Sequence, residues 1–354
     1  MIITITACGR FSGVIVTTEP QSSQTQTNPG EEPTVQATIL PTATAQPTQP
    51  PTEQPTEPPN PYPQIQALLR SNPPCDGNQA SRKDAILTLD ETLKNDASRW
   101  DPGIIAFYEN MIGFVESEIN EPVLTGVRIW SMYNHGFIVK TPSTVFAFDL
   151  VHGYSSWDYR IPDSILRQIQ VLFISHKHAD HRDNSISHAI LDFGGQVVAP
   201  LEDRLIGYDM IYVSPGDELN VAGLHVKVYD GLHGGIPVRI FEVTTPEGLK
   251  IMHTGDNQTS ETLPAGVKVD ILLLNAWVNE DGSAPAITGV RNSINKLTPS
   301  LTILGHFQEL SHDYDPSSNT SRLSFGSILA ADDVPLPGEV SVQVWGERCD
   351  FSTK

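Results

Sequence analysis

The chain has 354 residues, a length that one large α/β domain or two smaller domains can account for. It carries 42 acidic and 22 basic side chains, a formal net charge of −20, and only five of the acidic residues lie before residue 70. The part expected to fold is therefore strongly acidic. Such a surface repels phosphate backbones, which counts against nucleic acid as a partner.

The N-terminus holds a short apolar run that ends in Ile5-Thr6-Ala7-Cys8. This stretch resembles the lipobox of bacterial lipoproteins, in which the cysteine becomes the lipidated first residue after signal cleavage. The resemblance predicts that residues 1–18 anchor an exported protein at the outer face of the bacterial cell membrane. No positive charge precedes the short run, so a cytoplasmic protein with a frayed tail is the alternative.

Residues 19–63 are dominated by Pro, Thr, Gln, Ser and Glu and contain no Lys or Arg. This composition cannot bury enough apolar surface to offset the entropy lost on ordering the chain. We therefore predict a disordered, partly extended linker. The sequence that follows is divided into a helical extension over residues 64–122 and a main domain over residues 123–354.

Two further cysteines, Cys75 and Cys349, flank the part of the chain that is expected to fold. In an oxidising compartment such a pair tends to form a disulfide, which would join the helical extension to the C-terminal strand. We predict this bond. Two free thiols are the alternative, because a sequence does not show the geometry that a disulfide requires.

Two helical patterns follow the linker. The first covers residues 84–94, where Ile86, Leu89 and Leu93 recur at helical spacing. The second begins after Asp101, which can cap a helix, and continues with a proline suited to a first turn. Both helices are expected to pack on the domain that follows.

From residue 127 onward, short β-rich runs replace the helical spacing. Strands are expected at residues 127–132, 136–140, 144–149, 171–175, 197–199, 225–229, 239–244, 250–254, 271–275 and 301–305. Helices are expected over residues 184–191 and from near Thr288. This mixture predicts an α/β domain, and no apolar run is long enough to cross a bilayer.

Three imidazoles and one carboxylate lie within six residues, directly after the apolar run at residues 171–175: His176, His178, Asp180 and His181. Core packing does not explain them, because each group would need its own buried partner. Alternate histidines on an extended loop can point their nitrogens at one metal ion, while the aspartate and the next histidine turn toward a second. The run therefore predicts a metal site.

This run resembles the HxHxDH signature of the metallo-β-lactamase superfamily, and the order of later residues is similar to that family's over about residues 127–310. The resemblance implies an αββα sandwich whose ligands gather at the ends of strands. His233, Asp256 and His306 each follow an expected strand and match the family's remaining ligands. The implied set is His176, His178 and His233 on one ion, Asp180, His181 and His306 on the other, and Asp256 between them.

The same resemblance implies residues that support the ligands. Asp149, at the end of an expected strand, is assigned to steady the metal loop through hydrogen bonds. The segment at residues 133–138 looks like the opening strand of the subgroup that includes ascorbate-6-phosphate lactonase. His135 within it is a candidate for supporting a ligand or lining the cleft, against a hydrogen-bonded surface residue.

The other histidines carry weaker signals. His312 competes with His306 as the last ligand; we prefer His306, because an apolar strand delivers it, and expect His312 on a substrate-facing loop with Glu309. His253 lies in a buried-looking strand and is expected to be structural. His152 is a candidate for the cleft lining, with a surface role as the alternative.

The donor set implies that a metal-activated water attacks an electrophilic carbonyl or phosphoryl centre, with Asp180 as the proton acceptor. No cysteine lies near the ligands, which departs from the β-lactamases that use one. A small ester-like, lactone or phosphoester substrate is therefore favoured over a β-lactam. Two divalent ions are expected, zinc first and manganese second, because imidazoles and carboxylates accept either.

Two other functions stay open. A flavodiiron-type oxidoreductase shares the implied fold, but that family favours a carboxylate where His178 stands. The second alternative is a surface lipoprotein that keeps the metals but only senses or sequesters a ligand. The sequence identifies neither the substrate nor the oligomeric state.

Overall fold

The computed structural model describes residues 60–75, 80–205, 207–277, 287–315, 322–327 and 336–352. The predicted anchor at residues 1–18 and most of the predicted linker at residues 19–63 lie outside these ranges. The described residues all belong to one compact unit, residues 58–354. Within them, no helix is long and apolar enough to cross a membrane.

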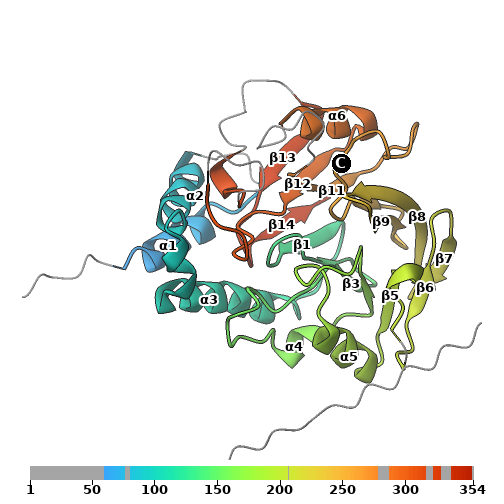
Figure 1. Ribbon diagram of the computed structural model, residues 1–354, viewed down its shortest axis with the longest axis horizontal. Helices are drawn as coiled ribbons and strands as arrows, with labels where there is room; N and C mark the ends of the chain where they lie inside the picture. The colour runs from blue at the N-terminus through green and yellow to red at the C-terminus, as the bar shows by residue number, and fades with distance from the viewer. Residues whose placement is uncertain are drawn as a thin grey trace, which may run out of the picture. The chain divides into compact units, whose positions relative to one another are not determined.

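Two seven-stranded mixed sheets form the centre of this unit (Figure 1). The first sheet has the order β14-β1-β2-β3-β4-β5-β6, with β1 Val127–Ser131, β2 Phe137–Lys140, β3 Val145–Phe148, β4 Val171–Phe173, β5 Gln196–Pro200, β6 Ile211–Val213 and β14 Arg348–Phe351. The second has the order β13-β12-β11-β10-β9-β8-β7, with β7 Glu218–Val221, β8 Leu224–His233, β9 Ile236–Thr244, β10 Lys250–His253, β11 Ile271–Asn275, β12 Leu301–Gly305 and β13 Glu339–Val342.

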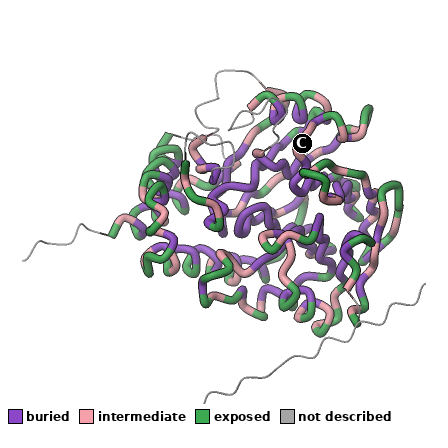
Figure 2. The backbone as a smooth tube through the Cα atoms, in the orientation of Figure 1, coloured by how far each residue is buried: buried purple, intermediate pink, exposed green. Residues whose placement is uncertain are grey.

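The two sheets face each other across an apolar core. Side chains alternate along each strand, so in β3 Phe146 and Phe148 join this core while Ala147 joins the core on the opposite face of the sheet. Phe173 of β4 and Phe241 of β9 meet across the gap with ring centroids 5.2 Å apart. Figure 2 shows the buried backbone concentrated in this central region. The central strands β2, β3, β4, β10, β11 and β12 are buried along nearly their whole length, so both of their faces are covered.

Helices cover the outer face of each sheet. Helix α5, Asn184–Asp192, packs on β4 and β5, and α6, Ile287–Leu297, packs on β11. In Figure 1, α3, α4 and α5 lie on one side of the paired sheets and α6 on the other. The predicted αββα sandwich is therefore confirmed.

The helical extension contains three α-helices, α1 Tyr62–Ser71, α2 Ala80–Leu93 and α3 Pro102–Glu118, and a 3₁₀ turn, η1 Asp96–Trp100. Helix α3 begins as predicted, since the Asp101 side chain accepts a hydrogen bond from the backbone N–H of Gly103 at 2.8 Å. Helix α1 was missed. Its first turn is proline-rich like the linker before it, but Tyr62 is buried against Phe107, with ring centroids 5.9 Å apart.

The other elements that the sequence did not predict are short. They are α4 Asp163–Leu166, two 3₁₀ turns, η2 Leu201–Asp203 and η3 Phe325–Ser327, and the strands β6, β7 and β13, while β14 was expected only as a C-terminal strand without bounds. None of these strands exceeds four residues, which is too short for alternation to be recognised. Pairing with a longer neighbouring strand holds two of them in their sheets, since β14 pairs with β1 and β13 pairs with β12.

A disulfide joins Cys75 and Cys349, whose Cα atoms lie 5.6 Å apart, as predicted. Cys75 follows α1, and Cys349 lies in β14 with its side chain in the core between the sheets. The bond spans 274 residues of sequence. It therefore ties the start of the described chain to the edge strand at its end.

Candidate metal centre

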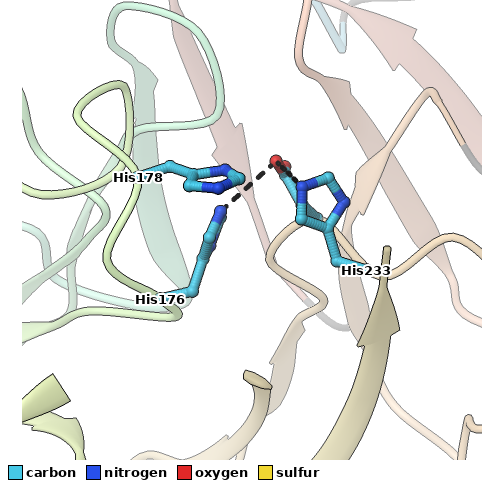
Figure 3. Close-up of side chains that lie close together, drawn as sticks. His176, His178 and His233 are labelled. Carbon is cyan, nitrogen blue, oxygen red and sulfur yellow. Dashed lines mark ion pairs between the residues drawn. The ribbon is translucent and has the colours of Figure 1, made fainter. Parts of the chain in front are cut away.

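Each sequence-predicted metal ligand lies near or just past the end of a strand. His176, His178, Asp180 and His181 occupy the loop after β4 in the first sheet. His233 is the last residue of β8, Asp256 follows β10, and His306 follows β12, all in the second sheet. The two sheets therefore supply opposite sides of one site, which Figure 3 shows for His176 and His178 facing His233.

A first group of donor atoms consists of His176, His178, His233 and Asp256, whose ligand atoms all lie within 4.8 Å of one another. Asp256 Oδ2 is 3.5 Å from His176 Nε2 and 4.0 Å from His233 Nε2, the two ion pairs dashed in Figure 3. Three imidazoles and one carboxylate are a ligand set that a divalent ion such as zinc accepts.

A second group consists of Asp180, His181, Asp256 and His306, with the same 4.8 Å limit. His181 Nε2 is 3.1 Å from Asp180 Oδ2 and 3.0 Å from Asp256 Oδ1. His306 Nε2 is 3.2 Å from that same Asp256 oxygen. Asp256 thus turns Oδ2 toward the first group and Oδ1 toward the second, which is the arrangement of a carboxylate between two ions.

The hydrogen bonding of the site fits a cation. Nε2 of His176 and Nε2 of His306 are buried and face Asp256 at 3.5 and 3.2 Å, but neither has a partner in hydrogen-bond geometry among the described residues. Leaving buried polar atoms unpaired is costly, and native proteins rarely do so without a ligand or water. A divalent ion among these atoms would satisfy them.

Asp149 orients two of the rings, in agreement with the supporting role assigned to it. Its carboxylate accepts hydrogen bonds from the backbone N–H and the hydroxyl of Ser175, both at 2.6 Å. It also lies 2.8 Å from Nδ1 of His181, while the Ser175 hydroxyl oxygen lies 2.9 Å from Nδ1 of His176. When Nδ1 of each ring donates in these contacts, Nε2 is left with a free lone pair directed at the site.

Charge within the site is balanced between carboxylates and imidazoles. Burial alone would lower the pKa of His181 and His306, but the carboxylates around them outweigh it. Asp256 and Asp180 raise the pKa of His181 well above its ordinary value, and Asp256 raises that of His306 to about 10. Burial lowers the pKa of His176 to about 3, so this ring is neutral. Without a cation, protons on His181 and His306 compensate the acidic groups.

Asn134, which the sequence did not mark as a site residue, positions Asp180. Its Nδ2 donates to Asp180 Oδ2 at 2.7 Å, and its carbonyl accepts from the backbone N–H of His306 at 3.0 Å. Asn134 and His306 both have positive φ, 58° and 67°. This strained backbone is rare for residues other than glycine and is concentrated at functional sites. Asparagine is among the residues that tolerate a positive φ best, and this preference was the only sequence signal for Asn134.

Trp277 was also missed, because it follows β11 at a position that no ligand motif marks. Its indole packs on His306 with ring centroids 4.6 Å apart and on His312 at 5.5 Å. His312 itself lies outside both ligand groups and pairs with Glu309, its Nε2 3.3 Å from Glu309 Oε2.

Two of the weaker candidates, His135 and His152, lie outside both ligand groups. His135 is fully buried and stacks on His253 with centroids 4.3 Å apart, so it supports the site from behind and does not face a substrate. His253 Nε2 lies 3.1 Å from the His135 carbonyl oxygen, in keeping with its expected structural role. His152 lies 3.0 Å from both the Ile161 N–H and the Ser185 hydroxyl oxygen, outside the ligand groups.

Comparison with known proteins finds no matching family model and no similar curated protein. Solved structures resemble the chain in shape. The metallo hydrolase Igni18 from Ignicoccus hospitalis is 17% identical over 65% of this chain and all of its own, with a TM-score of 0.47. The metallo-beta-lactamase fold protein YhfI from Bacillus subtilis is 10% identical over 64% of this chain and all of its own, with a TM-score of 0.45. The diiron beta-hydroxylase CmlA from Streptomyces venezuelae is 16% identical over 66% of this chain and 55% of its own, at 0.48.

Proposed function

We propose that this protein is a metal-dependent hydrolase that acts on a small ester-like, lactone or phosphoester substrate. The observation that carries the proposal is the placement of Asp256, a buried carboxylate whose two oxygens face two separate groups of imidazoles. Structural sites are generally closed around one ion, whereas paired ions bridged by a carboxylate suit hydrolysis.

We propose two divalent ions at this centre, zinc before manganese. The first would be held by His176, His178 and His233, the second by Asp180, His181 and His306, with Asp256 between them. When bound, such ions lower the pKa of water and stabilise the negative charge that develops on the substrate oxygen.

The side chains around the ions divide the remaining work. Asp256 is 5% exposed and Asp180 20%, so Asp180 is the acidic ligand nearer the opening of the site. Asn134 holds Asp180 at Oδ2. We assign to the Asp180 carboxylate the acceptance of the proton that the attacking water loses.

The substrate class rests on what surrounds the donor atoms. Cys75 and Cys349 are joined in a disulfide, so neither is a ligand as in some β-lactamases. The Trp277 indole packs on His306 and adds an apolar surface beside the ligands. The likeness to the ascorbate-6-phosphate lactonase subgroup rests on the sequence at residues 133–138 alone.

We also propose that the protein is exported and reaches the membrane only through a lipid on Cys8, and that it does not bind nucleic acid. The disulfide supports an oxidising location. Metabolic labelling with a fatty-acid analogue in a bacterial host tests this proposal. Label on the wild-type chain but not on Cys8→Ser is expected, and equal labelling would contradict it.

Hydrolysis is tested on the full chain by measuring metal content and assaying lactones, phosphodiesters and β-lactams. We expect bound zinc, and activity that a chelator abolishes and added zinc restores. Asp180→Asn is expected to lower turnover by at least about 100-fold with the circular dichroism unchanged, because it removes both a ligand charge and the proton acceptor. Asp192→Asn is the control, since Asp192 is exposed on α5. A metal-loaded but inactive wild type would favour the ligand-binding alternative.

A further inference from the structure

The loop after β12 carries a second ionisable pair beside the metal centre. It begins at His306 and is anchored at Leu310, whose backbone N–H donates to the hydroxyl of Tyr133 at 2.7 Å. Tyr133 precedes Asn134, the residue that holds Asp180. The position of the loop is therefore tied to the ligands of the second group.

Glu309 and His312 form this pair. The Glu309 side chain is only 8% exposed, and the hydroxyl of Ser311 donates to its Oε1. Its other oxygen, Oε2, lies 3.3 Å from Nε2 of His312. The imidazole of His312 is 42% exposed, so a buried carboxylate holds one nitrogen of a ring that is itself partly open to solvent.

Trp277 links this pair to the metal centre. One indole contacts both His306, a predicted ligand, and His312, with ring centroids at 4.6 and 5.5 Å. Both imidazoles therefore contact a single aromatic ring. A substrate that binds at His306 and extends past Trp277 would meet His312.

The surroundings of His312 favour its protonated form. The hydrogen bond that His312 donates to Glu309 is the largest effect and raises the pKa of His312, and Asp180 adds to it. Burial and the nearby His306 oppose this rise. The guanidinium of Arg322 also donates to the His312 backbone carbonyl at 3.5 Å. A protonated imidazole that faces a substrate is a general acid.

We propose that His312, held by Glu309, is a catalytic residue that donates a proton from Nδ1 to the leaving group. This assignment rests on the proposed hydrolase function and deepens it. It predicts a preference for substrates whose leaving group is a poor one, such as an alkoxide, because only these need a proton donor.

In the hydrolysis of an ester, the proposed step conserves atoms and electrons. The oxygen of water bonds to the acyl carbon, and the bond from that carbon to the leaving oxygen breaks. The leaving oxygen keeps the electron pair and takes the proton from His312 Nδ1, while Glu309 stabilises the imidazole through Nε2. The proton lost by the water passes through Asp180 to solvent, and solvent restores the imidazolium. One ester and one water yield one acid and one alcohol.

The experiment compares leaving groups on the zinc-loaded full chain. Two matched pairs of probes are used, one of carboxylic esters and one of phosphodiesters, each with either p-nitrophenolate or ethoxide as the leaving group. His312→Gln is expected to slow release of ethoxide by about 100-fold or more and release of p-nitrophenolate by less than about threefold. The matched control is His225→Gln, since His225 is also 42% exposed and lies 3.8 Å from a carboxylate, Glu218, on β7.

A second measurement does not depend on turnover. The imidazole NMR signal of His312 is titrated in the wild type and in Glu309→Gln, with and without zinc, and the variant is expected to titrate at lower pH. Equal slowing for both leaving groups, or an unchanged His312 titration, would overturn the assignment while leaving hydrolysis intact. A zinc-loaded wild type that cleaves none of the four probes and none of the lactones would refute the proposed function, and this assignment with it.

Discussion

Asp149 shows how a single side chain prepares a metal site. It is fully buried, has a φ of 46°, and accepts from both the backbone and the side chain of Ser175. Its contact with Nδ1 of His181 leaves Nε2 of that ring for an ion. Ser175 passes the same constraint to His176. Rings oriented in this way lose little freedom when the ion binds.

Asp149→Asn should separate ring orientation from folding. The amide can still accept the Ser175 N–H bond, but it cannot accept from both Ser175 and His181. We expect zinc affinity to fall by about 10- to 100-fold, measured by competition with a chromophoric chelator, with the circular dichroism unchanged. Asp192→Asn, on the exposed face of α5, should leave affinity as it is. Unchanged affinity in Asp149→Asn would show that His181 orients itself.

The buried carboxyl group of Asp90, away from the metal site, should make the stability of the fold depend on pH. It is buried in α2 and accepts from the Gln308 side chain and the N–H groups of Phe325 and Gly326. Burial raises its pKa to about 6 from the ordinary 3.8. The folded state therefore binds this proton more tightly than the unfolded chain does. The contribution of Asp90 to the free energy of unfolding is greatest below about pH 4. It falls by an amount on the order of 3 kcal/mol as the pH rises to about 6.

Asp90→Asn removes this dependence. The free energy of unfolding, measured by chemical denaturation at several values between pH 4 and pH 7, should decline more steeply with rising pH in the wild type than in the variant. The comparison is of slopes, since the variant also alters the contact with Gly326. Parallel curves would mean that Asp90 does not titrate in this range.

At the scale of elements, glycine lies at or just past the ends of two strands in the second sheet, β10 and β12, where a side chain would clash with its neighbours. Gly305 ends β12 directly before His306, and a Cβ there would lie 2.2 Å from Nδ1 of His135. Gly255, before Asp256, has a φ of 51° and would place a Cβ 2.6 Å from the Cβ of Ser175. The buried rings behind the site therefore determine where β10 and β12 deliver their ligands.

Gly305→Ala is expected to destabilise the fold by about 1–3 kcal/mol through overpacking, and to weaken zinc binding because His306 must shift with the strand end. Thermal unfolding and zinc competition measure the two effects. The control is Gly113→Ala on the exposed face of α3, where no atom lies within 4 Å of the added carbon. That change should stabilise the helix by about 1 kcal/mol. Equal behaviour of the two variants would contradict the proposed crowding.

At the scale of the whole molecule, the helical extension is bound to the sandwich by packing, by charge and by one covalent bond. Arg82 of α2 pairs with Glu347 in a fully buried contact beside β14. The disulfide from Cys75 to Cys349 closes the same region. The edge strand β14 thus pairs with β1 on one side and is fastened to residues far earlier in the chain.

Loss of the disulfide should therefore cost about 2–5 kcal/mol of unfolding free energy. In guanidinium denaturation of a Cys8→Ser background, reductant is expected to lower the stability of the parent to that of Cys75→Ser. Cys75→Ser itself should be insensitive to reductant. A parent that is unaffected by reductant would show that the bond does not contribute in solution.

The sequence alone was sufficient where the signal is local. The donors His176, His178, Asp180 and His181 are neighbours on one loop, and the Asp101 cap depends only on the residues beside it. Strands β11 and β12 have the bounds predicted for them, because a run of buried apolar residues between polar ends marks its own limits. These features follow from backbone geometry and burial within a few residues.

Only the tertiary structure decided which distant groups meet. It placed the two oxygens of Asp256 against two groups of imidazoles and buried His135 behind the ligands. It also brought His306 and His312 into contact with the same indole, that of Trp277. The pairing of β14 with β1 likewise joins segments more than two hundred residues apart. Periodicity reports whether a residue is buried, but not what it is buried against, because that depends on how separate elements pack.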